Sequence, residues 1–109
     1  MPEISLGEFE QTVLLAILAR GVGAFALEVR REMEAESGRA VSRGAFYTTL
    51  ERMKKKGLVT WVATQPVNAR RRETQRLFSV TPRGMDALRM TQQHLQDRWR
   101  RLEEALGEP

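Results

Sequence analysis

Apolar residues recur at alternating steps of three and four along the last quarter of the chain, and this pattern constrains the fold most. Such steps place the side chains along one face of a helix. A helix from about Arg83 to Leu106 would be about 36 Å long, which exceeds twice the ~13 Å radius of gyration of a domain of this size. We expect it to project and to pair with a second copy, although a helix packed wholly on its own core is the alternative. The predicted dimerisation seam is Met85, Leu88, Gln92, Leu95, Trp99, Leu102 and Leu106.

Three shorter helices are predicted in the first half of the chain. The first runs from Leu6 to Arg20 and ends at a glycine, which is favoured just past a helix. The second covers about residues 24–37, and the third runs from Arg43 to Lys56 with Ser42 as its N-cap. The side chains expected to face the core are Leu6, Phe9, Val13, Leu14, Ile17 and Leu18 in the first helix, Phe25, Leu27 or Ala26, Val29 and Met33 in the second, and Phe46, Leu50 and Met53 in the third.

Two β-branched and aromatic runs follow, at residues 58–63 and 76–80. They are typical of short strands, and the polar stretch between them predicts a hairpin with a long tip. A final helix begins after Thr81, with Pro82 at the first position, where the missing N–H group has no cost. The order predicts a mainly α fold with a small β-hairpin, a winged helix-turn-helix followed by a long C-terminal helix.

Charge is segregated along the chain. The net charge is +4, but residues 39–83 hold eleven Lys and Arg against two acids, whereas the remaining residues hold seven against twelve. A strongly positive face indicates a polyanion partner such as nucleic acid. From charge alone, a solvated basic loop is the alternative. We interpret residues 1–81 as a DNA-binding domain and residues 82–109 as a dimerisation helix, together one structural unit.

The third helix is the predicted DNA reader. With Phe46 inward, Gly44 and Ala45 leave room for a close approach to base edges, threonine hydroxyls suit those edges, and arginines suit phosphates. A structural helix with a solvated face is the alternative, but it leaves the adjacent basic hairpin unexplained. The predicted DNA contacts are Ser42, Arg43, Gly44, Ala45, Tyr47, Thr48, Thr49, Arg52 and Lys55 on this helix, and Arg70, Arg71, Arg72 and Arg76 on the hairpin.

Other classes of function are disfavoured by what the sequence lacks. The chain has no cysteine, its one histidine, His94, lies on the amphipathic last helix, and the sequence shows no obvious acid constellation. Gly21-Val22-Gly23 lies between predicted helices rather than after a strand, which excludes a dinucleotide loop. We therefore expect no catalytic residue, no metal and no cofactor. No apolar run approaches the ~18 residues of a membrane span, and the first residues do not resemble a signal peptide, so we expect no membrane association and a cytoplasmic location.

Two blocks of the sequence resemble the PadR family of bacterial transcriptional regulators, in its short form with a single C-terminal helix. The first is Val41 to Met53, VSRGAFYTTLERM, which continues to Lys56-Gly57-Leu58-Val59. The second is Leu77 to Gly84, LFSVTPRG, which is similar to the strand and Leu-Thr-Pro-x-Gly of the family.

This resemblance implies a homodimeric repressor that binds double-stranded DNA at a nearby promoter. It also implies a small aromatic or drug-like effector held between the first and last helices. Trp99 is the candidate to stack on such a ligand, although we favour the interpretation that it fills the dimer core. The competing hypothesis is a winged-helix module that binds a protein partner or double-stranded RNA.

Overall fold

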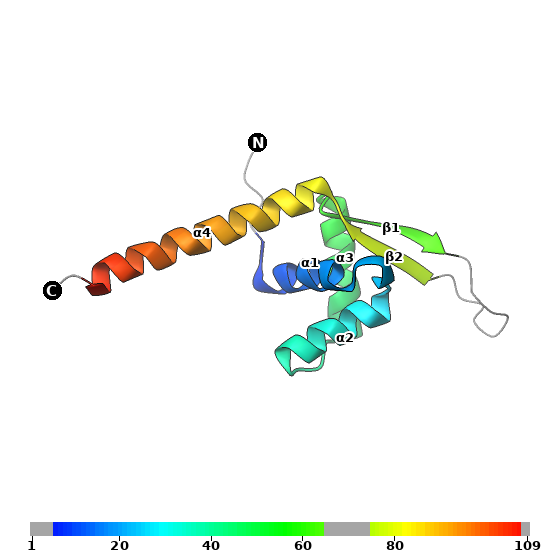
Figure 1. Cartoon of the computed structure of the whole chain (residues 1–109). Helices are drawn as coiled ribbons and strands as arrows, with labels where there is room; N and C mark the ends of the chain where they lie inside the picture. The colour runs from blue at the N-terminus through cyan, green and yellow to red at the C-terminus, as the bar shows by residue number, and fades with distance from the viewer. Residues whose placement is uncertain (1–5, 65–74, 108–109) are drawn as a thin grey trace.

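The computed structural model describes residues 6–64 and 75–107. The order of elements confirms the predicted winged helix-turn-helix with a long C-terminal helix. The elements are α1 (Glu8–Arg20), the short 3-10 helix η1 (Gly21–Gly23), α2 (Ala26–Ser37), α3 (Arg43–Lys55), β1 (Val59–Thr64), β2 (Gln75–Val80) and α4 (Pro82–Gly107). Figure 1 shows α1, α2 and α3 as a compact body, from which α4 and the β1–β2 hairpin project in opposite directions.

The first three helices bury a shared apolar core. Its largest buried side chains come from all three helices, both strands and the residue before β1: Val13 and Leu14 of α1, Val29 and Met33 of α2, Phe46, Leu50 and Met53 of α3, Leu58 just before β1, Val59 of β1, and Phe78 of β2. Dense packing of this kind fixes the three helices relative to one another. The inward face of α3 is thereby confirmed as Phe46, Leu50 and Met53.

Three residues predicted to face the core are exposed instead. Phe9, Leu18 and Leu27 are each more than a third exposed. Leu15 of α1 is exposed as well, so α1 is apolar on both its inner and its outer side. Periodicity cannot separate the two sides of such a helix, which explains the error for Phe9 and Leu18. On α2, Ala26 packs against the core in place of Leu27.

The two strands form an antiparallel hairpin that is attached to the body at its second strand. Trp61 pairs with Phe78 in the register, and their rings meet edge to face with 5.5 Å between centroids. The N–H of Phe78 donates to the carbonyl of Ala24 at 3.0 Å, and Phe25 forms a β-bridge with Leu77. The segment between α1 and α2 therefore covers the outer edge of β2 and ties the wing to the helical body.

A compact junction joins the start of α4 to the segment that follows α3. The backbone N–H of Thr81 donates to the carbonyl of Leu58 at 3.0 Å, and its hydroxyl donates to the carbonyl of Gly57 at 2.6 Å. The same hydroxyl accepts from the N–H of Gly84 at 3.0 Å. Gly84 is buried directly against the Leu58 carbonyl, where a Cβ atom has no room. The junction thus fixes the direction in which α4 leaves the body.

Beyond this junction α4 extends freely. Ala87 is buried and Leu88 packs against the core, but every residue from Gln92 to Gly107 except Asp97 is exposed. The molecule measures 68 × 35 × 23 Å as a result. The projection expected from the length of this helix is present in the structure (Figure 1).

Candidate nucleic-acid interface

The outer side of α3 combines small residues, hydroxyls and cations. Seven of the contacts predicted for this helix are exposed: Ser42, Arg43, Gly44, Ala45, Thr48, Arg52 and Lys55. A Cβ atom on Gly44 would meet only the Ser42 hydroxyl at 3.8 Å, so the first turn of α3 has open space in front of it. A helix of this kind can approach the major groove closely with its N-terminal end.

Two of the predicted contacts on α3 lie away from this exposed side. Thr49 is only 5% exposed, because three residues after Phe46 and four before Met53 it falls on the inner face of the helix. Its assignment as a DNA contact is wrong. Tyr47 is half-buried beside Phe46, with 5.4 Å between ring centroids, and the Arg43 guanidinium lies 5.7 Å from its ring. Tyr47 therefore orients Arg43 at the start of the helix.

The start of α3 is held by polar contacts, one of which was predicted from the sequence. The Ser42 hydroxyl accepts from the N–H of Ala45 at 3.3 Å, which confirms the predicted N-cap. One residue earlier, the Val41 N–H donates to the Glu34 carboxylate at 2.8 Å, and the Val41 carbonyl accepts from Arg30 at 3.1 Å. Two side chains of α2 thus form hydrogen bonds with both backbone groups of Val41, which positions the start of α3.

A cation–π cluster lies between α3 and the wing. Lys54 places its ammonium 3.9 Å from the centroid of Trp61, and the Arg76 guanidinium lies 5.0 Å from the same ring. Arg76 also pairs with Glu51 at 3.6 Å. Lys54 was not among the residues singled out from the sequence. A contact between Arg76 and DNA stays a prediction. Arg70, Arg71 and Arg72, predicted to contact DNA from the wing, lie outside the described residues.

A buried carboxylate of α1 faces the end of α3. One oxygen of Glu10 accepts from the N–H of Gly7 at 3.0 Å, and the other lies 3.3 Å from Lys56 and 3.7 Å from Arg52. Burial alone would raise the pKa of Glu10, but the Gly7 N–H, Lys56 and Arg52 outweigh it, so the pKa lies below its ordinary value. The carboxylate is therefore ionised at neutral pH. This cluster could not be predicted from the sequence, because its residues come from helices that are far apart along the chain.

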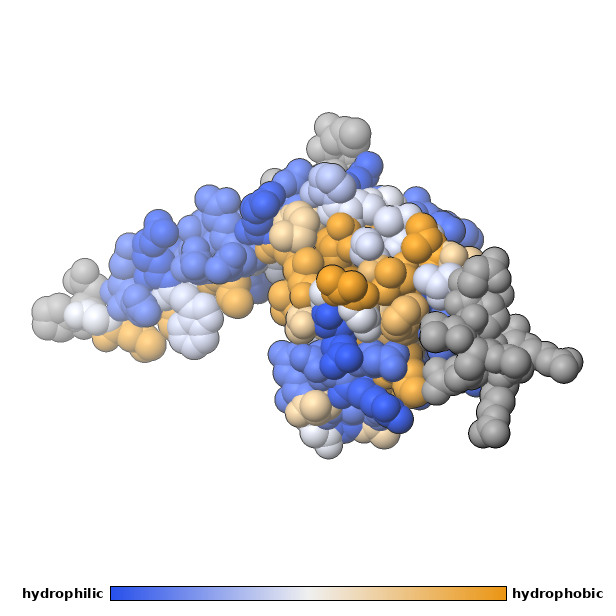
Figure 2. All heavy atoms as spheres, turned by 45° about the vertical axis from the view of Figure 1, so that its right-hand side comes forward, coloured by the Kyte–Doolittle hydropathy of each residue, from blue (hydrophilic) through white to orange (hydrophobic). Residues whose placement is uncertain are grey.

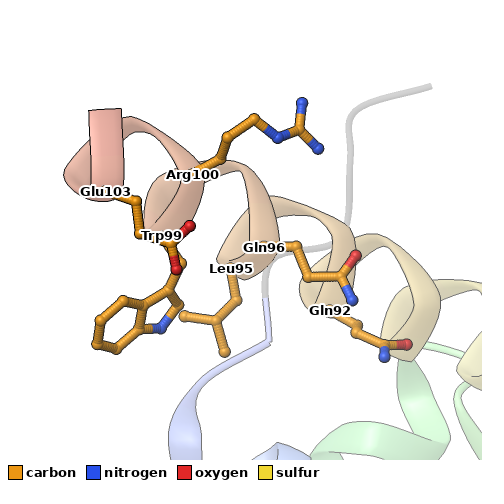
Figure 3. A pocket seen from close by; sticks show the side chains of 6 residues that line it. All are labelled: Gln92, Leu95, Gln96, Trp99, Arg100 and Glu103. Atoms are coloured by element: carbon orange, nitrogen blue, oxygen red, sulfur yellow. The ribbon is translucent and has the colours of Figure 1, made fainter. Parts of the chain in front are cut away.

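The predicted dimerisation seam divides into two parts. Met85 and Leu88 are half-buried, and Leu88 packs against the body of the same chain. The distal seam residues are exposed, and they are Gln92, Leu95, Trp99, Leu102 and Leu106. Figure 3 shows Trp99 and Leu95 on one side of α4 and Arg100 directed away from them; together with Gln92, Gln96 and Glu103 they line a shallow groove.

No helix in the described part of the chain is both long enough and apolar enough to cross a membrane. Among the same residues, no group of three or more histidine or acidic side chains is placed to hold a metal ion.

Comparison with known proteins points to one class of regulator. Residues 14–90 match the profile of the transcriptional regulator PadR-like family. A PadR-like transcription factor from Bacteroides fragilis superposes with a TM-score of 0.65 at 20% identity, over 91% of this chain and 86% of that one. RosR of H. salinarum superposes with a TM-score of 0.67 at 23% identity, over 97% of this chain and 94% of that one. Among curated protein sequences there is no match. At these identities the two structures establish the fold, while the family profile covers most of the chain.

Proposed function

Because the chain belongs to the PadR-like family of transcriptional regulators, we propose that it is a homodimeric repressor that binds double-stranded DNA at a nearby promoter. Members of this family are regulators rather than enzymes. The observation that carries the proposal is the face of α3, which is open and cationic on the outside and fully anchored on the inside. In this proposal residues 1–81 bind DNA in the cytoplasm, and residues 82–109 join two copies.

The proposed contacts divide by chemistry. Gly44, Ala45 and Thr48 approach base edges in the major groove, because they are small or carry a hydroxyl and methyl group. Arg43, Arg52 and Lys55 contact phosphates on either side and hold the register. The free N–H groups near Ser42 favour a further phosphate. The arginines of the wing add contacts to the backbone or the minor groove.

The proposed dimer rests on exposed apolar surface. Leu95, Trp99, Leu102 and Leu106 follow one another along the projecting part of α4, and Trp99 is 57% exposed. Further exposed apolar side chains occur on α1 and just after it, namely Phe9, Leu15, Leu18 and Val22. Figure 2 shows apolar atoms gathered on the body and along the lower side of α4. Exposed apolar surface of this kind favours association, and in this proposal a second copy covers the α4 residues.

The proposal also includes relief of repression by a small aromatic ligand. The support for it is the indole of Trp99, which stands beside Leu95 in a groove that also contains Gln92 and Gln96 (Figure 3). An aromatic compound could stack on this ring, and the amides could bond to its polar groups. Trp99 would then serve the dimer core and the ligand in turn.

Binding to labelled duplexes tests the proposal. Fluorescence anisotropy would compare the duplex upstream of the protein's own gene, a scrambled duplex and an RNA duplex across a salt series. We expect a preference of about a thousandfold for the upstream duplex and a steep salt slope. The Arg43→Ala variant should bind more weakly, whereas Arg100→Ala, which removes the same charge from the projecting part of α4, should not.

The alternative function makes different predictions in the same assay. A protein-interaction module should bind all three duplexes weakly and alike, and a double-stranded RNA reader should prefer the A-form duplex. Either result would replace the repressor proposal.

A further inference from the structure

The buried carboxylate of Glu10 has two oxygens with different partners. Oε1 accepts from the N–H of Gly7 and closes the first turn of α1. Oε2 accepts from the ammonium of Lys56 at 3.3 Å and lies 3.7 Å from Nε of Arg52. Glu10 is only 6% exposed, and a buried charge is tolerated only where it is paired and hydrogen-bonded. The capping role accounts for Oε1 but not for Oε2, which faces the C-terminal end of α3.

Arg52 belongs to the outer face of α3 as well as to this cluster. It follows Thr48 by one helical turn and its side chain is 53% exposed. The ion pair with Glu10 uses Nε, on one edge of the guanidinium. The other N–H groups of the Arg52 guanidinium are left for a second anion. A phosphate group suits them, because its oxygens can accept hydrogen bonds from a guanidinium.

We propose that Glu10 is a positioning residue for DNA recognition, which holds the Arg52 guanidinium in the orientation needed for a phosphate contact. This inference rests on the proposed function of α3. A long side chain that is free in solution loses rotamer freedom when it binds, and a side chain already held by a neighbour loses less. Lys56, on the same carboxylate, keeps the end of α3 against α1, and the cluster of one carboxylate and two cations carries a net positive charge.

A double-mutant cycle separates this role from a purely structural one. The variants are Glu10→Gln, Arg52→Ala and the combination. Gln keeps an oxygen for the Gly7 N–H and the volume of the side chain, so the fold should persist, which thermal melting would check. The matched control is Glu8→Gln, because Glu8 is an exposed acid of the same helical turn and its loss changes the net charge equally.

The expected result is non-additive binding to the upstream duplex. Arg52→Ala should lower the salt slope by about 0.9 in the wild-type background. In the Glu10→Gln background the same change should have a smaller effect, with a coupling of about threefold or more in affinity. With Glu8→Gln the effect of Arg52→Ala should be unchanged. Additive effects of Glu10→Gln and Arg52→Ala would overturn the proposal.

A second measurement does not depend on DNA. Nitrogen relaxation of the Arg52 Nε–H group should show an ordered side chain in the wild type and in Glu8→Gln, and a mobile one in Glu10→Gln. Equal mobility in wild type and Glu10→Gln would overturn the inference, whatever the affinity for DNA. If the wild type shows no preference for its upstream duplex, the proposed function fails, and the relaxation data still decide whether Glu10 orders Arg52.

Discussion

Replacing Gly84 by alanine tests the junction from which α4 projects. A Cβ atom at this position would overlap the carbonyl oxygen of Leu58 and would lie 2.8 Å from a methyl group of Val80. The Val80 side chain can turn away. The Leu58 carbonyl cannot, because it belongs to the backbone and accepts a hydrogen bond from Thr81 at 3.0 Å. The start of α4 must therefore move away from the body.

The expected loss of stability follows from one favourable and two unfavourable contributions. Alanine favours a helix over glycine by up to about 1 kcal/mol. Overpacking a tight contact costs about 1–3 kcal/mol, and displacing α4 also weakens the Thr81 hydrogen bonds, at about 1 kcal/mol each. Since the obstructing atom belongs to the backbone, we expect the cost of overpacking to lie near the upper end of its range. We expect Gly84→Ala to lower the free energy of unfolding by about 3 kcal/mol.

Urea denaturation followed by circular dichroism would measure this difference, at one fixed protein concentration because the stability of a dimer depends on it. Gly107→Ala is the matched control, since it is the same substitution in the same helix with nothing within 4 Å of the added atom. We expect its stability to change by less than about 0.5 kcal/mol. A Gly84→Ala protein as stable as the wild type would refute the argument that this glycine is required for close packing.

Four further predictions concern other parts of the molecule. The pKa of Glu10 is lowered in the folded protein, so the wild type should be more stable than Glu10→Gln above pH 4.5. This difference in stability should disappear as the pH falls through the pKa of Glu10 in the folded protein. Urea midpoints that differ equally between the two proteins at pH 7 and at pH 3 would contradict this prediction. Ser42→Ala should cost about 1 kcal/mol through loss of the N-cap, measured by the same denaturation, and an unchanged midpoint would show that the cap is not needed. Trp99→Glu combined with Leu102→Glu should give monomers in sedimentation velocity, because two carboxylates would enter the proposed interface, and a persistent dimer would refute the seam. Arg71→Ala combined with Arg72→Ala should weaken binding to all duplexes alike and reduce the salt slope; an unchanged slope would remove the wing arginines from the contacts.

The order of elements could be predicted from the sequence because its signals are local. Ser42 and Pro82 mark the starts of α3 and α4, and Gly38 ends α2 in the left-handed conformation with φ of 70°. Such residues act through neighbours within one helical turn. The apolar periodicity of α3 identified its buried face for the same reason, whereas the buried residues of α4 are Gly84 and Ala87, which the periodicity did not single out. The predicted limits of the helices and strands differ from the observed ones by two residues at most.

The site could be predicted only in part, because its details depend on contacts between distant segments. Lys56 and Glu10 are 46 positions apart, and nothing local indicates that a glutamate of α1 faces α3. The hydrogen bonds of Arg30 and Glu34 to the backbone of Val41 could not be predicted from the sequence either. Thr49 shows the opposite error: its polar side chain suggested a contact, whereas its angular position on α3 already placed it inside.

The junction around Thr81 gives α4 the properties of a lever. Gly57 and Leu58 come two and three residues after the end of α3, and both are hydrogen-bonded to Thr81, so α3 and the 26-residue α4 turn together. A helix of that length spans about 39 Å, and a rotation of about 5° at its root displaces its tip by about 3 Å, close to the 3.4 Å rise of one DNA step. In the proposed dimer, the number of base pairs between half-sites is therefore sensitive to the few atoms packed around Gly84, far from any DNA contact.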